Sequence, residues 1–161
     1  MMKLRILSVG HKMPNWVQTG FEEYFKRIQP MMSVELVELP PVKRSKNPSP
    51  AEIEKYKAVE AATILNAKQP KEILWLLEVK GKMLSTEKLA DKLSVAMQDG
   101  ADIALVIGGA DGVADDVLQA ADFKWSMSDL TLPHPLVRVI LMEQLYRAMS
   151  IINNHPYHRG S

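Results

Sequence analysis

Four side chains that can bind RNA or move a proton lie within five residues near the end of the chain: His155, Tyr157, His158 and Arg159. An aromatic ring beside Arg and His can stack on a base, while the cations pair with phosphate or a base edge. Histidine also accepts a proton readily near neutral pH. A frayed, inert tail is the alternative, and a metal site is disfavoured because this segment lacks nearby carboxylates and thiolates.

A glycine-rich segment, Gly108–Gly112, follows the apolar run Asp102–Ile107. Glycines directly after a buried strand let the backbone approach a ligand closely and expose N–H groups to it. The spacing is GGxxG, which matches neither GxGxxG nor GxxxxGK[ST], so a phosphate-cradling nucleotide fold is disfavoured. An adenosine-type ligand held by backbone groups and a plain turn without a ligand both remain open.

A second unusual segment, Ser128–Pro135 (SDLTLPHP), joins a strand to a helix and ends between two prolines. Such a stiff turn suits the wall of a site for a ring system. The alternative is a loop that caps the following helix through His134 or Thr131. In open parallel sheets, ligands bind beyond the carboxyl ends of the strands. The segments expected there are Glu78–Lys82, Gly108–Gly112 and Met127–His134.

The elements that position these segments alternate between strand and helix along the chain. Ser49-Pro50-Ala51-Glu52 is a capping box with Pro at the first helical position, and Ser85 is a second N-cap. The pattern predicts an α/β fold with a mostly parallel sheet flanked by helices. The expected strands are Lys3–Val9, Val34–Leu39, Ile73–Val79, Asp102–Ile107 and Lys124–Ser128, and the expected helices are 14–30, 50–66, 85–100, 115–121 and 135–153.

Length and composition indicate one soluble domain spanning residues 1–161, expected in the cytoplasm. The apolar and charged fractions, 47% and 24%, are ordinary for a globular chain. The chain has no Cys, which excludes disulfides, thiolate metal sites and cysteine nucleophiles. The longest apolar runs, Ile73–Leu77 and Ile103–Ile107, are far shorter than the ~20 residues that span a bilayer. We therefore expect no membrane association.

The net charge of +1 is unevenly distributed. Residues 1–47 carry eight Lys or Arg against four Asp or Glu, whereas residues 98–130 carry seven Asp and one Lys. The proline-rich segment Pro40–Pro50 is predicted to be an exposed basic loop. This balance excludes a protein that coats nucleic acid by bulk charge, but it is compatible with a locally basic RNA-binding surface.

The last predicted helix is apolar on nearly every side, so it needs two packing partners. We expect one face to pack on the sheet and the other to meet a second subunit. Glu143 and Arg147 form an i,i+4 pair, usually a surface or interface bridge worth about 0.2–0.5 kcal/mol.

Segments spread over the chain from Met2 to Arg159 resemble the RlmH-type methyltransferase family of the SPOUT class. These segments are KMPNWVQTGFEEY, LLEVKGKMLSTEKLA, ALVIGGADG, WSMSDLTLPHPLVRVILMEQLYRA and NHPYHR. The resemblance implies a sheet whose C-terminal segment forms a trefoil knot, and a homodimer with a shared substrate pocket. It also implies methyl transfer from S-adenosylmethionine, without a metal, to N3 of a pseudouridine in helix 69 of bacterial 23S rRNA within the ribosome.

The resemblance also assigns roles to residues of this chain. We hypothesise that His158 and Arg159, supplied by the partner subunit, handle the N3 proton while Tyr157 packs on the base. The candidates for rRNA contact are Lys43, Arg44, Lys46 and His155. The cofactor would contact Leu77, Gly108, Gly109, Met127, Ser128, Asp129, Leu130, Thr131 and Leu132.

Two other function classes remain open. A ribosome-binding or assembly factor could keep the fold without turnover, although it would not need both walls of a cofactor pocket. A flavodoxin-like domain that binds another nucleotide would show cofactor colour or phosphate dependence after purification.

Overall fold

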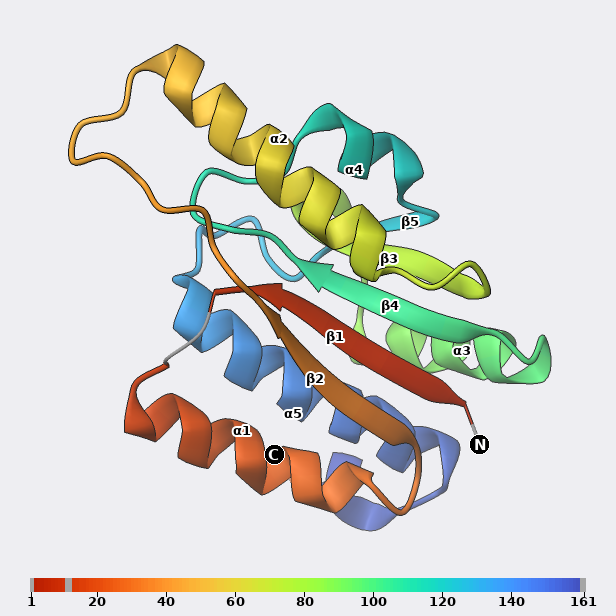
Figure 1. Cartoon of the computed structure of the whole chain (residues 1–161). Helices are drawn as coiled ribbons and strands as arrows, with labels where there is room; N and C mark the ends of the chain where they lie inside the picture. The colour runs from red at the N-terminus through yellow and green to blue at the C-terminus, as the bar shows by residue number, and fades with distance from the viewer. Residues whose placement is uncertain (1, 11–12, 160–161) are drawn as a thin grey trace.

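The computed structural model describes residues 2–10 and 13–159, and its centre is a five-stranded sheet (Figure 1). The strand order is β2-β1-β4-β3-β5, and every pairing is parallel. This confirms the predicted fold class; the trefoil knot stays a prediction. The strands are β1 Lys3–Val9, β2 Ser33–Leu39, β3 Glu72–Met83, β4 Asp102–Ile107 and β5 Phe123–Ser126.

Helices cover both faces of the sheet and make a three-layer arrangement (Figure 1). One face packs against α1, α3 and α5, and the other against α2 and α4. The helices are α1 Asn15–Ile28, α2 Pro50–Ala67, α3 Thr86–Gln98, α4 Asp115–Ala120 and α5 His134–Ile152, followed by the 3₁₀ turn η1 Pro156–Arg159. Within the described ranges, no helix is long and apolar enough to cross a bilayer.

Local capping signals were reliable guides to helix boundaries. Ser49 and Glu52 form the predicted capping box at the start of α2, and the Ser85 hydroxyl accepts a hydrogen bond from the Lys88 N–H at the start of α3. The capping alternative for the Ser128–Pro135 loop is wrong, because Pro133 is the N-cap of α5 and no side chain described by the structure caps that helix.

Helix α5 lies between α1 and α3 on its face of the sheet. The flanks that the sequence analysis assigned to a second subunit are therefore partly covered by helices of the same chain. Gly20 of α1 allows a close approach, since a Cβ there would be 3.3 Å from the Val139 side chain.

Strand β3 is longer than predicted, running to Met83 instead of Val79, and β5 ends at Ser126 instead of Ser128. The register of β3 against β5 shifts between Leu77 and Lys82, so the intervening residues bulge out of the ladder. A β-bulge next to a binding site changes the direction in which the side chains of that strand point. Polar and charged residues follow Val79, so the sequence pattern alone does not predict that β3 continues to Met83. This part of the strand depends on pairing with β5.

We expect Gly81→Ala to destabilise the fold by about 1–3 kcal/mol. A Cβ at Gly81 would lie 2.6 Å from the carbonyl oxygen of Lys124, so the β3 bulge and β5 would have to separate. Urea unfolding followed by circular dichroism measures the change. Gly20→Ala, which meets only a side chain at 3.3 Å, is the matched control with a smaller expected loss. Equal stability of Gly81→Ala and wild type would show that the bulge relaxes freely.

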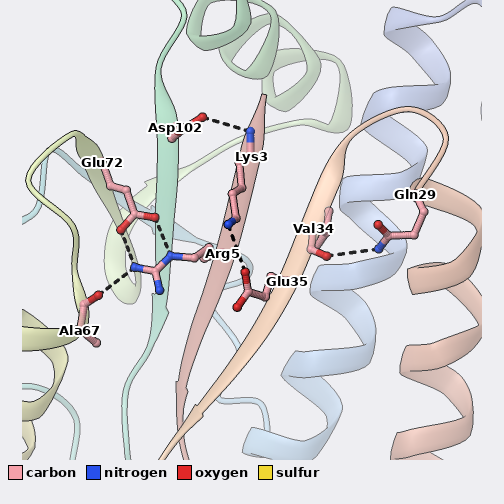
Figure 2. A network of polar contacts seen from close by, with 8 residues as sticks. All are labelled: Lys3, Arg5, Gln29, Val34, Glu35, Ala67, Glu72 and Asp102. Carbon is pink, nitrogen blue, oxygen red and sulfur yellow. Dashed lines mark hydrogen bonds and ion pairs between the residues drawn. The ribbon is translucent and has the colours of Figure 1, made fainter. Parts of the chain in front are cut away.

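A buried ion pair connects β1 to the start of β3 across β4 (Figure 2). Arg5 donates to both carboxylate oxygens of Glu72, at 2.7 and 2.6 Å, and to the carbonyl of Ala67 at the end of α2. The N–H of Gln69 also donates to Glu72, at 2.8 Å. Burial alone would raise the pKa of Glu72, but these hydrogen bonds hold it below its usual value. The network ties α2 to the opposite end of the sheet from the site described next.

Candidate functional site

A pocket of about 630 Å³ lies where the bulge of β3 meets the carboxyl ends of β4 and β5. Chain connections leave β1 and β4 toward opposite edges of the sheet, so a topological switch point lies beside it. Both the volume and the largely apolar lining are typical of small-molecule sites. The lining residues are Leu77, Glu78, Val79, Ile107, Gly108, Gly109, Ala110, Gly112, Val113, Trp125, Met127, Ser128, Leu130, Thr131, Leu132, His134 and Val137.

The pocket brings together the residues that the resemblance assigned to cofactor contact, with one exception. Asp129 is exposed and does not line the pocket. Leu130 lies at the rim and is 72% exposed. The three segments expected at strand ends do meet here, and each contributes to the wall.

The glycine turn after β4 is shaped by close packing. A Cβ on Gly108 would be 2.6 Å from the Val113 side chain, and one on Gly109 would be 2.6 Å from a carboxylate oxygen of Glu60. The turn closes through the N–H of Gly112, which donates to the Gly109 carbonyl at 3.1 Å, with a φ of +82° at Gly112. The backbone conformation of Gly112 and the short, stiff Val113 side chain beside Gly108 therefore favour glycine at these two positions, whereas the flexible Glu60 side chain could move away from a Cβ at Gly109.

His134 lines the pocket, within the segment Met127–His134 that was expected at a strand end; the sequence analysis gave its side chain no role beyond a possible helix cap. Its Nε2 lies 3.2 Å from the Ser8 hydroxyl, which joins the end of β1 to the start of α5. Burial, with the positive charge of Arg138, lowers the pKa of His134, while a backbone contact with Gly108 acts in the opposite direction. The lowered pKa favours the neutral imidazole at pH 7. A histidine between two prolines after a strand was the available signal.

Arg138 anchors the first turn of α5 and was also missed as a site-building residue. It is 3% exposed, and it donates to Glu38 at 2.9 Å and to the Gly10 carbonyl at 3.0 Å. It therefore fixes α5 to the carboxyl ends of β1 and β2. An arginine inside the otherwise apolar run Leu136–Met142 was the sequence signal.

The basic loop before α2 lies against the glycine turn. Arg44 forms a 2.8 Å ion pair with Asp111, and its guanidinium is 5.9 Å from the centre of the Tyr56 ring. Asp111 of the glycine turn is thus neutralised by a residue of this loop. Lys43 and Lys46 are exposed. The loop thus places positive charge beside the pocket.

The C-terminal tail does not reach the pocket of its own chain. His155, Tyr157, His158 and Arg159 are all outside the pocket lining. The Tyr157 hydroxyl donates to Glu143 at 3.0 Å. Glu143 lies nine residues after His134, which is about 13 Å along the helix axis. His155 is exposed, and its Nδ1 accepts from the Tyr157 N–H at 3.2 Å.

A metal site is not evident in the described ranges, which contain no group of three or more His, Asp or Glu side chains suited to holding an ion.

The family model and the named relatives that match this chain indicate the same family. A model of the family described as "Predicted SPOUT methyltransferase" matches residues 2–158. A protein of Psychrobacter sp. (strain PRwf-1) named "Ribosomal RNA large subunit methyltransferase H" is 69% identical over 162 residues, covering 99% of this chain and 100% of the relative. A protein of the same name from Acinetobacter baumannii (strain ATCC 17978) is 60% identical over 159 residues, with the same coverage.

Among solved structures, the fold is similar to that of a "probable methylase family protein" from Haemophilus influenzae Rd KW20. The TM-score is 0.52 with 12% identity, and the match covers 97% of this chain and 69% of the other. At this identity the similarity concerns the fold alone.

Proposed function

Because this chain belongs to the SPOUT methyltransferase family, we propose that it methylates large-subunit rRNA of bacterial ribosomes. More specifically, we propose transfer of the methyl group of S-adenosylmethionine to N3 of a pseudouridine in helix 69 of 23S rRNA, on the assembled ribosome in the cytoplasm. The names of the 60–69% identical relatives support the rRNA substrate. The main support for the proposal is the pocket, because its lining comes from segments of this chain that resemble the family.

The pocket fits the proposed cofactor in size and in chemistry. Its lining is mostly apolar, which suits an adenine ring, and backbone groups of the glycine turn can hydrogen-bond to the polar edge of a nucleoside. Leu77, Gly108 and Thr131 come from three different walls of the pocket and would hold the cofactor between them. When bound, S-adenosylmethionine supplies an electrophilic methyl group on a sulfonium.

The substrate atom, N3 of pseudouridine, carries a weakly acidic proton. A residue near N3 must accept this proton or stabilise the negative charge that develops as it leaves. We assign this role to His158 and Arg159: the imidazole accepts the proton and the guanidinium stabilises the charge. Positioning of the base beside the methyl donor supplies much of the remaining rate enhancement. Two reactants held together in one site react as a unimolecular system.

A homodimer is needed for the tail to meet a pocket. In one chain the tail packs on α1 and α5 and lies outside the lining of that chain's own pocket, which supports a dimer in which the partner subunit supplies His158 and Arg159. An apolar surface is available for such contact: Trp16 is 58% exposed. The first turns of α5 add half-buried apolar side chains, namely Leu136, Val139 and Ile140. Aromatic residues such as Trp are enriched in the interfaces between proteins.

The basic loop would contact rRNA phosphates. Lys43 and Lys46 are exposed, and Arg44 keeps donors beyond the one that binds Asp111. His155, exposed on the tail, is a further candidate contact. With a net charge of only +1, binding depends on this local charge and on a preformed RNA shape, so affinity should fall as salt rises.

The direct test is methyl transfer from labelled S-adenosylmethionine to ribosomes from a strain that lacks the homologous enzyme, followed by mapping of the labelled nucleotide. Label at N3 of the helix 69 pseudouridine is the expected result. Label elsewhere in 23S rRNA would correct the substrate atom. Ribosome binding without cofactor binding or label would instead favour a non-catalytic ribosome-binding factor.

We expect Gly108→Ala to weaken S-adenosylmethionine binding at least tenfold while the protein stays folded. The new Cβ would be 2.6 Å from the Val113 side chain, so the glycine turn has to move away from its position in the pocket wall. Isothermal titration calorimetry measures the affinity. The double variant Gly108→Ala/Val113→Ala removes the clashing atoms and should recover most of it; failure to recover would contradict displacement as the cause.

A further inference from the structure

The C-terminal tail folds back along α5 instead of extending away from it. Helix α5 ends at Ile152, and Asn154 adopts a left-handed conformation with a φ of +54°. The N–H of His155 then donates to the carbonyl of Ser150 at 2.8 Å. These two features reverse the chain direction, so that η1 packs against α5.

Tyr157 makes the contacts that hold this reversed segment. Its ring centre is 4.6 Å from that of Tyr146 on α5 and 6.5 Å from that of Tyr24 on α1. The Arg147 guanidinium lies 4.9 Å from the same ring centre, within cation–π range. The hydroxyl donates to Glu143, and burial raises the pKa of Tyr157, so the phenol remains a donor at neutral pH. The ring is thus engaged by its own chain.

Glu143 receives three hydrogen bonds and one further ion-pair contact in this arrangement. Arg147 donates to one carboxylate oxygen through Nε at 2.9 Å, and its Nη2 lies 2.8 Å from the same oxygen. The Tyr157 hydroxyl donates to that oxygen as well. Gln144 donates to the other oxygen at 2.7 Å and itself accepts from Thr86 of α3. The Arg147 and Glu143 side chains are only 21% and 18% exposed. A carboxylate bound from several directions has a fixed position.

We propose that Tyr157 is a positioning residue, and that Glu143 and Arg147, acting through it, hold the tail so that His158 and Arg159 occupy a fixed place relative to the body of their own chain. This inference rests on the proposed function for its catalytic consequence and replaces the hypothesis that Tyr157 packs on the base. In a dimer, a tail fixed on one subunit is presented to the pocket of the other as part of a rigid surface.

Amide hydrogen exchange of the intact protein tests the anchoring without cofactor, RNA or activity. We expect Glu143→Gln and Tyr157→Ala to speed exchange of the segment 153–159 at least fivefold. Tyr157→Phe keeps the ring contacts but loses the hydroxyl bond to Glu143, so exchange should rise less than in Tyr157→Ala. Glu54→Gln is the matched control: it removes a similar carboxylate–cation pair, Glu54 with Lys57 on α2, far from the tail in sequence. Unchanged tail exchange in Glu143→Gln would overturn the anchoring.

Kinetics then test the positioning. Because Glu143 and Tyr157 are outside the pocket lining, Glu143→Gln and Tyr157→Ala should lower kcat at least tenfold and leave the KM for S-adenosylmethionine unchanged. Tyr157→Phe should lower kcat less than Tyr157→Ala does, because the ring contacts remain. A faster-exchanging tail with wild-type kcat would overturn the positioning role, as would loss of activity in Tyr157→Phe with a tail that is still protected. If the wild-type protein transfers no methyl group, the proposed function is wrong. The amide hydrogen exchange experiment still shows whether Tyr157 and Glu143 hold the tail.

Discussion

Arg5→Ala is expected to destabilise the protein by about 3–5 kcal/mol, because it leaves a buried carboxylate without its partner. Glu72 is 4% exposed, and Arg5 supplies two of its hydrogen bonds (Figure 2). The same substitution leaves the Ala67 carbonyl without the Arg5 donor, which loosens the end of α2. Urea unfolding at pH 7 measures the loss.

Lys3→Ala provides the matched control on the same strand. Its ammonium pairs with Glu35 at 3.4 Å, and both side chains are about half exposed, at 45% and 50%. Exposed pairs contribute little, so the expected change is below about 1 kcal/mol. The hydrogen bond from Lys3 to Asp102 uses the backbone N–H and survives the substitution. Similar losses for Arg5→Ala and Lys3→Ala would contradict a special role for the buried pair.

The Glu72–Arg5 pair also predicts acid sensitivity. The pKa of Glu72 is lower in the folded protein than its ordinary value of 4.5, despite the opposing effect of burial. A depressed carboxyl pKa stabilises the fold fully above the unfolded value, and this contribution is lost as the pH falls through the folded value. The stability difference between wild type and Glu72→Gln should therefore narrow below about pH 4.5. A pH-independent difference would show that ionisation of Glu72 is not its source.

Arg159→Ala and His158→Ala are each expected to reduce single-turnover methylation of ribosomes by about 100–1000-fold. Under the proposed function they remove the group that stabilises the developing charge and the group that accepts the N3 proton. Neither residue lines the pocket of its own chain, so cofactor affinity should stay within about twofold of wild type. Loss of cofactor binding in parallel with activity would point to a structural role for the tail.

Mixed dimers decide which subunit supplies the tail. A dimer of one Arg159→Ala subunit and one Gly108→Ala subunit contains one intact pocket and one intact tail, on different chains. If the tail acts on the partner's pocket, this mixed dimer has one working site and about half of wild-type activity at a cofactor concentration that does not saturate Gly108→Ala. If the tail acts within its own chain, the mixed dimer has no fully working site, and the shared-pocket proposal fails.

Local sequence patterns determined most of the secondary structure. Hydrogen bonds between near neighbours produce the capping box of Ser49 and Glu52, and a continuous apolar run produced β4 with the predicted bounds. Gly100, with a φ of +69°, directly follows the C-cap of α3, as its conformational freedom suggests. The strand-end segments of an α/β pattern must gather at one edge of a parallel sheet, so the location of the pocket could also be anticipated.

The tertiary structure decided which distant residues meet. His134 joins Ser8 across 126 positions, and Arg5 joins Glu72 across 67, and neither separation has a sequence signature. β3 continues past Val79 only because β5 pairs with its far end. The basic loop reaches the glycine turn through Arg44 and Asp111 because both follow strands that end at the same edge of the sheet. Propensity acts over a few residues, whereas these contacts depend on strand order, which the local pattern does not encode.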